Sequence, residues 1–251
     1  DERKHARILR DLARGNAGFR STGGRLVGAG GRLRAAVLGV NDGLVSNFSL
    51  VMGVTGGTHD VNIVLLAGVA GLLAGAFSMA AGEYVSMRSQ RDIYEFELEK
   101  EAEELREWPE EEEEELVLIY QAKGLSRQES EGIAKRVMGD PAVALDTMAR
   151  EELGLDPSDL GSPWGAAASS FLAFVAGAGL PLLPYIFRGG GSAVTASAVL
   201  SGIALVIVGS ALAGISGRSV LWGGLRMLLA GASAAAVTYG VGSLIGTAVI
   251  G

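Results

Sequence analysis

Two side chains with metal-binding chemistry lie four residues apart at the end of an apolar stretch. The stretch GVAGLLAGAFSMAAG, from Gly68 to Gly82, contains Met79, and Glu83 follows it directly. Residues four apart project from the same side of a helix, so the thioether and the carboxylate would point together. Both groups bind divalent transition metals. We predict that this helix lines a path for such an ion; the alternative is that Met79 only fills a helix core.

The same helix should carry carboxylates out of the apolar stretch. Residues 83–104 contain neither Gly nor Pro, so one helix is expected to continue from lipid into water. Polar groups then recur at intervals of three or four along one side of it. They are Met79, Glu83, Ser86, Gln90, Tyr94, Glu97, Glu101 and Glu104.

An acidic block follows, and it supplies further candidate ligands. Residues 95–115 hold 13 Glu against two basic residues, a local charge of −11 in a chain of net charge −7. Because the chain has no Cys, ligands must be oxygen, His or methionine sulfur. Helical spacing on three predicted helices selects Glu97, Glu101, Glu104, Glu112, Glu115, Met148 and Glu152 as metal ligands. The alternative is a solvated acidic surface.

A second polar group lies inside the first apolar stretch. The sequence LGVNDGLVSNFSLVMGV places Asn41 and Asp42 well within a span expected over residues 35–57. A carboxylate at such depth costs about 2.5–3.5 kcal/mol, so it usually faces a cavity or a substrate route. We therefore predict Asn41 and Asp42 as pathway residues, with Ser46 and Asn47 extending the polar lining. The alternative is a helix-breaking Asn-Asp-Gly turn at the interface.

The elements that must position these groups are predicted to be membrane helices. Hydrophobic residues make up 49% of the chain and cluster in blocks near the 20 or so residues that cross a bilayer. The blocks cover about residues 35–57, 62–87, 164–187, 192–215 and 220–250. Pro181 and Pro184 should distort the third span. Gly71-x-x-x-Gly75 and Gly242-x-x-x-Gly246 should allow close helix packing.

We therefore predict an all-α polytopic protein with five transmembrane helices, and we divide the chain into four regions. Residues 1–34 form a basic leader, 35–89 the first two spans, 90–159 an acidic helical metal-binding domain and 160–251 the last three spans. The leader has nine Lys and Arg, so the leader and the acidic domain should be cytoplasmic. Because five spans offer few pathway walls, a two-fold homodimer is expected to form the route.

Two further groups could bind metal. In the leader, Glu2 and His5 have the E-x-x-H spacing of ferritin-like di-iron helices, although the same pattern is common on solvated helices. The leader could thus be the tail of a ferritin-like domain. His59 and Asp60, in the loop after the first span, could receive or release an ion, or could simply be solvated.

These motifs resemble the vacuolar iron transporter family. The resemblance rests on LGVNDGLVSNFSLVMGV, AGAFSMAAGEYVSMRSQRD, the Glu-rich insert, DTMAREELGL and PLLPY, and it covers about residue 34 to the C-terminus. It implies homodimers with five membrane helices per subunit that move Fe²⁺, and often Mn²⁺, out of the cytoplasm in exchange for protons. It makes Asp42 and Met79 route positions. It makes Glu101, Glu104, Glu112, Glu115, Met148 and Glu152 ion-collecting positions.

The chain also departs from that family. Gly71 stands where plant-type members carry a Glu, and Glu83 stands where those members have Gly. Glu83 is therefore expected to take part in proton or metal handling.

The resulting prediction is a proton-coupled exporter of Fe²⁺, not an enzyme, in a bacterial inner membrane. Mn²⁺, Zn²⁺ and Co²⁺ are further candidate substrates, and no organic cofactor or nucleic-acid partner is expected. Expected partners are lipid, metal ions, protons and a second copy of the chain. One alternative is a membrane-anchored iron store or ferroxidase, as in membrane-bound ferritins that join a ferritin-like domain to this module. Another is a metal-sensing regulator.

Overall fold

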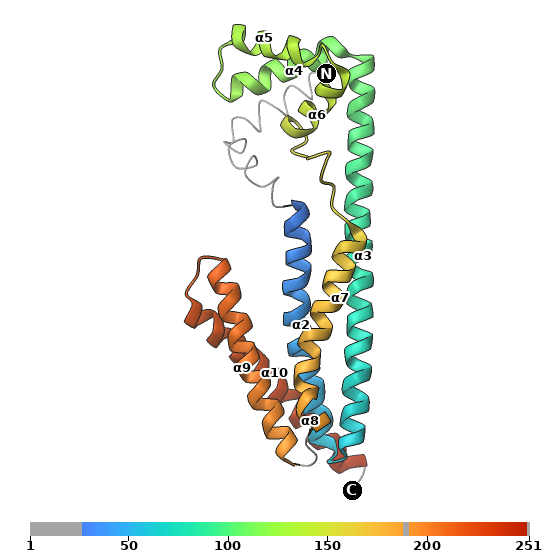
Figure 1. The fold of residues 1–251 in the computed structure, drawn as a ribbon, viewed down its shortest axis with the longest axis vertical. Helices are drawn as coiled ribbons and strands as arrows, with labels where there is room; N and C mark the ends of the chain where they lie inside the picture. Colours follow the sequence, from blue (N-terminus) through green and yellow to red (C-terminus); the bar gives the residue numbers. More distant parts are fainter. Residues whose placement is uncertain (1–26, 188–190, 250–251) are drawn as a thin grey trace. The chain divides into compact units, whose positions relative to one another are not determined.

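The structure is all-α over the residues that it describes. It is a computed structural model that describes residues 27–187 and 191–249 (Figure 1). Two compact units result: Arg32–Ser86 together with Pro163–Gly251, which we call the apolar unit, and Met87–Ser162, which we call the acidic unit. The leader helix and the pair Glu2 and His5 lie outside the described residues.

Five helical stretches among the described residues are long and apolar enough to cross a membrane. They are Arg34–Gly57, Val61–Glu107, Pro163–Phe187, Gly191–Ile215 and Val220–Ala248. The predicted number of spans is therefore confirmed by length and composition. The homodimer and the cytoplasmic position of the acidic unit stay predictions.

The first span is a single helix, α2 (Val27–Gly57), which includes Asn41-Asp42-Gly43 without a break. The alternative of a turn at this point is therefore wrong. Polar side chains project sideways from a helix and leave its backbone hydrogen bonds in place, so Asn and Asp do not by themselves end it. Asp42 consequently lies on a helix flank within the apolar unit.

The second span is the first part of α3 (Val61–Glu107), a helix of 47 residues. It is continuous from the apolar stretch through Met79 and Glu83 to the acidic residues, as the absence of Gly and Pro after Gly82 predicted. It ends before Pro109, which begins the next helix. One uninterrupted helix thus contributes residues up to Ser86 to the apolar unit and residues from Met87 onward to the acidic unit.

The third span is distorted at its prolines, as predicted. α7 (Pro163–Gly179) gives way to a 3₁₀ turn, η3 (Leu180–Leu182), and then to the short α8 (Leu183–Phe187). Pro181 cannot donate a backbone hydrogen bond, which explains the local change of helix type. α9 (Gly191–Ile215) and α10 (Val220–Val249) complete the apolar unit, and Gly217 between them has a positive φ of 66°.

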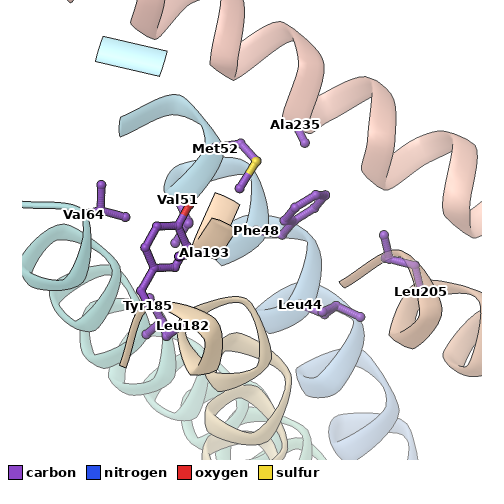
Figure 2. Close-up of a cluster of buried hydrophobic side chains, with 10 residues drawn as sticks. All are labelled: Leu44, Phe48, Val51, Met52, Val64, Leu182, Tyr185, Ala193, Leu205 and Ala235. Carbon is purple, nitrogen blue, oxygen red and sulfur yellow. The ribbon is translucent and has the colours of Figure 1, made fainter. Parts of the chain in front are cut away.

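The core of the apolar unit surrounds α2 (Figure 2). Figure 2 shows side chains from α2 facing residues of the other spans; the cluster is Leu44, Phe48, Val51, Met52, Val64, Leu182, Tyr185, Ala193, Leu205 and Ala235. Glycines bring α7 against α2: a methyl group at Gly43 would overlap the Phe174 carbonyl oxygen, and one at Gly177 would overlap that of Val40. This close backbone approach holds the Asp42 turn of α2 beside α7.

The acidic unit adds α4 (Pro109–Ala122), α5 (Arg127–Val137) and α6 (Pro141–Glu151) to the end of α3. A capping box starts α5: the Ser126 hydroxyl accepts a hydrogen bond from the Glu129 backbone N–H, and the Glu129 carboxylate accepts one from the Ser126 backbone N–H. Buried residues of α4, α5 and α6 form the core of this unit: Leu116, Val117, Ala134 and Met148.

Candidate functional site

A pocket of about 320 Å³ lies between α2, α3 and α7 in the apolar unit. Its lining residues are Asp42, Ser46, Asn47, Leu50, Gly71, Gly75, Ser78, Met79 and Phe174. The two residues that the sequence singled out most strongly, Asp42 of α2 and Met79 of α3, therefore border one cavity. A carboxylate, a thioether, two hydroxyls and an amide offer a mixed oxygen and sulfur donor set for a divalent cation.

Hydrogen bonds fix two of the polar lining residues. Ser46 Oγ donates to the backbone oxygen of Asp42 at 2.5 Å, which is the usual return of a helical serine to the preceding turn. Asn47 Nδ2 donates to the backbone oxygen of Ala178 at 2.6 Å, across to the end of α7. Asp42 itself is exposed, whereas Asn47 is buried. The Asp42 carboxylate is therefore the accessible charged group of the pocket lining, and the Asn47 amide is buried.

Two predicted pathway residues do not line this pocket. Glu83 is half-buried on α3, one turn beyond Met79, and Asn41 is half-buried on α2 beside Asp42. The Oδ1 atom of Asn41 is buried and has no hydrogen-bond partner within the described part of the chain. The shared helix face of Met79 and Glu83 thus extends past the pocket instead of ending in it.

Three of the predicted ligands in the acidic unit converge. Glu101 of α3, Glu112 of α4 and Glu152, which follows the last turn of α6, each place one carboxylate oxygen within 4.8 Å of the other two. Glu101 and Glu112 are only 2% and 3% exposed. Three carboxylates brought together in a buried position repel one another, and a divalent cation relieves that repulsion. We call these residues the carboxylate cluster.

The other four predicted ligands lie on α3, α4 and α6, the helices that also carry or adjoin the carboxylate cluster. Glu104 and Glu115 lie three residues beyond Glu101 and Glu112 on the same helices, half-buried and buried respectively. Glu97 is half-buried one turn earlier on α3. Met148 is fully buried and packs with Leu116 and Val117 in the core of the acidic unit.

Basic side chains pair with acids at the surface of this unit. Lys123 pairs with Glu151, and Arg127 pairs with Glu114 at 3.0 Å and with Glu131 at 2.7 Å. Each of these pairs joins a basic side chain to an acidic residue outside the carboxylate cluster.

Two ion pairs made by Arg150 shift the pKa of Arg150 and of Asp156. Arg150 bonds Asp146 and Asp156, and these two contacts raise the pKa of Arg150. The Arg150 guanidinium at 2.8 Å, together with Ser158, lowers the pKa of Asp156 to about 2. Asp156 is therefore ionised at any physiological pH.

Sequence reasoning did not single out several lining residues. Ser78 and Phe174 carry no motif of their own, Gly75 was expected only to allow close helix packing, and Gly71 was noted for packing and for standing where plant-type members carry a Glu. The packing prediction itself fits the structure, because the Phe174 ring occupies the space of a side chain at Gly75. Ser78 could have been found from its place beside Met79, one residue earlier on α3.

The described chain is thus a multi-pass helical membrane protein with a polar pocket between apolar helices and a carboxylate cluster in a separate acidic unit. Residues 33–243 match the VIT family, and the chain belongs to that family.

Named relatives agree with this assignment. The vacuolar iron transporter of Acanthamoeba castellanii is 39% identical over 223 residues, which cover 87% of this chain and 80% of the relative. Vacuolar iron transporter 1 of Arabidopsis thaliana is 35% identical over 212 residues, 84% of this chain and 85% of the relative. The Eucalyptus grandis protein of the same name is 34% identical over 218 residues, 86% of this chain and 88% of the relative. The resemblance inferred from the motifs is therefore confirmed.

Proposed function

We propose that this chain carries Fe²⁺ across a membrane in exchange for protons. The observation that carries the proposal is that Asp42 and Met79, from two different apolar helices, line one pocket. The names of the relatives support iron as the substrate. Oxygen with thioether donors suits first-row transition ions better than Ca²⁺ or Mg²⁺, so Mn²⁺, Zn²⁺ and Co²⁺ are further candidates.

Proton exchange follows from the chemistry of Asp42. A carboxylate binds either a metal ion or a proton, so protonation on the receiving side drives release of the ion. We assign export from the cytoplasm across a bacterial inner membrane, with the basic leader and acidic unit inside. A homodimer would place two such pockets beside a two-fold axis.

The acidic unit is proposed to collect ions before transport. The carboxylate cluster, supported by Glu97, Glu104, Glu115 and Met148, would bind the ion, and the surrounding negative charge would raise the local cation concentration. Asn41 and Glu83 are proposed to pass the ion or the proton on beyond the pocket.

Proteoliposomes with an Fe²⁺ indicator and a pH dye inside test the proposal. The wild-type chain should take up Fe²⁺ and move protons the other way, and Asp42→Asn should abolish both fluxes. Asp140→Asn is the matched control, because Asp140 lines neither the pocket nor the carboxylate cluster and Asn can cap the start of α6 as Asp does. Unchanged flux with Asp42→Asn would refute the assignment of the ion site.

The same assay separates the alternatives. Oxygen consumption with Fe²⁺ and no flux would indicate a ferroxidase or store. Metal binding without flux or oxygen consumption would indicate a regulator.

A further inference from the structure

Asn47 is the most buried polar residue of the pocket lining. It is 2% exposed and lies on α2, five residues beyond Asp42. The two ends of its amide have different chemistry, since the nitrogen only donates hydrogen bonds and the oxygen only accepts them. Which end faces which neighbour therefore decides what Asn47 can do in the pocket.

The contact with α7 determines this orientation. The backbone oxygen of Ala178 can only accept, so the Asn47 atom 2.6 Å from it is the amide nitrogen. Pro181, three residues beyond Ala178, has no N–H with which to bond this carbonyl. Asn47 supplies the donor instead, and its Oδ1 atom must then point away from Ala178.

The Oδ1 atom has no hydrogen-bond partner among the described residues, and less than 1 Å² of it is accessible. It faces α3 at Gly71: a Cβ atom on Gly71 would lie only 3.1 Å from it. Both Asn47 and Gly71 line the pocket. Buried acceptors are normally satisfied, so one left open at a polar pocket indicates a ligand that the protein alone does not supply.

We propose that Asn47 Oδ1 is a neutral oxygen ligand of the ion in the pocket, together with the Asp42 carboxylate and the Met79 sulfur. The inference rests on the proposed function of this pocket and adds a residue that determines its specificity. An amide oxygen is a hard donor that does not bind protons at physiological pH. It balances the soft sulfur of Met79, and it keeps hold of the ion while Asp42 exchanges metal for proton.

The competing explanation is that Asn47 only caps the distorted end of α7. A cysteine test separates the two, because the chain has no Cys and an introduced thiol is unique. Asn47→Cys would replace the oxygen by a thiolate ligand, which binds Cd²⁺ strongly. Ser49→Cys is the matched control, since Ser49 is also buried on α2 but does not line the pocket.

The measurement is the ultraviolet absorption of the cadmium–thiolate bond in the purified full-length variants, titrated with Cd²⁺ alone. Asn47→Cys should give this band and reach half-saturation at a Cd²⁺ concentration at least tenfold below that of Ser49→Cys. Adding Asp42→Ala to Asn47→Cys should raise that concentration at least tenfold. The proposal is overturned if the absorption band of Asn47→Cys is no stronger than that of Ser49→Cys. It is also overturned if adding Asp42→Ala leaves the Cd²⁺ concentration at half-saturation unchanged.

A second pair of variants decides the question if Asn47→Cys cannot be purified. Asn47→Asp keeps an oxygen but loses the donor to Ala178, whereas Asn47→Leu loses both. An oxygen ligand predicts that Asn47→Asp binds Mn²⁺ within threefold of the wild type and Asn47→Leu at least tenfold more weakly. Equal loss in both variants would show that only the donor matters. Neither binding assay needs transport, so absence of Fe²⁺ flux in wild-type proteoliposomes would refute the proposed function separately.

Discussion

Replacing Glu112 by Gln tests the carboxylate cluster directly. The change keeps the shape of the side chain and removes one of three negative charges whose oxygens lie within 4.8 Å of one another. Two unit charges at 4.8 Å, the limit of these separations, repel by about 3.5 kcal/mol at an effective dielectric constant of 20, and protonation or hydrogen bonds reduce this repulsion. Without metal, Glu112→Gln should therefore unfold at the same or a higher temperature than the wild type.

Added metal should stabilise the wild type more than Glu112→Gln. An ion present at 100 times its dissociation constant stabilises the folded state by about 2.7 kcal/mol, which raises the unfolding midpoint of a unit of this size by about 10–20 °C. Tenfold weaker binding leaves about 1.4 kcal/mol and hundredfold weaker binding about 0.4 kcal/mol. The rise in the unfolding midpoint that metal causes should accordingly be half or less of the wild-type rise in Glu112→Gln.

Trp108 allows this unit to be observed within the full-length chain. The chain has three Trp, and Trp164→Phe with Trp222→Phe leaves only the one between α3 and α4. Its fluorescence during heating, with and without Mn²⁺, reports the midpoint of the acidic unit.

Glu111→Gln is the matched control for this experiment. It removes the same charge from the neighbouring position, but Glu111 is exposed and lies outside the carboxylate cluster. An equal metal-induced rise in Glu111→Gln and Glu112→Gln would show that the cluster is not the metal site.

Two further predictions concern packing and pH. Gly43→Ala should destabilise the apolar unit by about 1–3 kcal/mol, because the new methyl group overlaps the Phe174 carbonyl oxygen, whereas Gly82→Ala, which meets open space on α3, should be neutral or stabilise by up to about 1 kcal/mol. Thermal unfolding followed by circular dichroism in detergent measures both, and equal midpoints for the two variants would contradict the close approach of α2 and α7. Arg150 lowers the pKa of Asp156 from its ordinary value of 3.8 to about 2, so the pair stabilises the acidic unit above about pH 4 and this contribution disappears as the pH falls through 2. The difference in Trp108 unfolding midpoint between wild type and Asp156→Asn should therefore be largest above pH 4 and vanish near pH 2, and a difference that does not change with pH would refute the assignment.

Local signals in the sequence were sufficient for the helices. Blocks of about 20 apolar residues predicted the spans, and the absence of Gly and Pro beyond Gly82 predicted the unbroken α3. The distortion of the third span at Pro181 and Pro184 followed from the same kind of local signal. These features depend on residues close together in the sequence, and the interactions between such residues do not depend on how the rest of the chain folds.

Which polar groups converge was decided only by the packing of the helices. Asp42 and Met79 line one pocket because α2 and α3 pack at a particular distance and rotation, with Gly71 of α3 against Leu50 and Asn47 of α2, and helical spacing does not contain that rotation. For the same reason Glu83 shares a face with Met79 and yet lies outside the pocket lining.

The open oxygen of Asn47 depends even more on tertiary structure, since its direction follows from a carbonyl 131 residues away. The sequence by itself thus determined the elements and the kinds of ligand that they carry. The tertiary structure decided which ligands face one another, because that depends on contacts between side chains far apart in the chain.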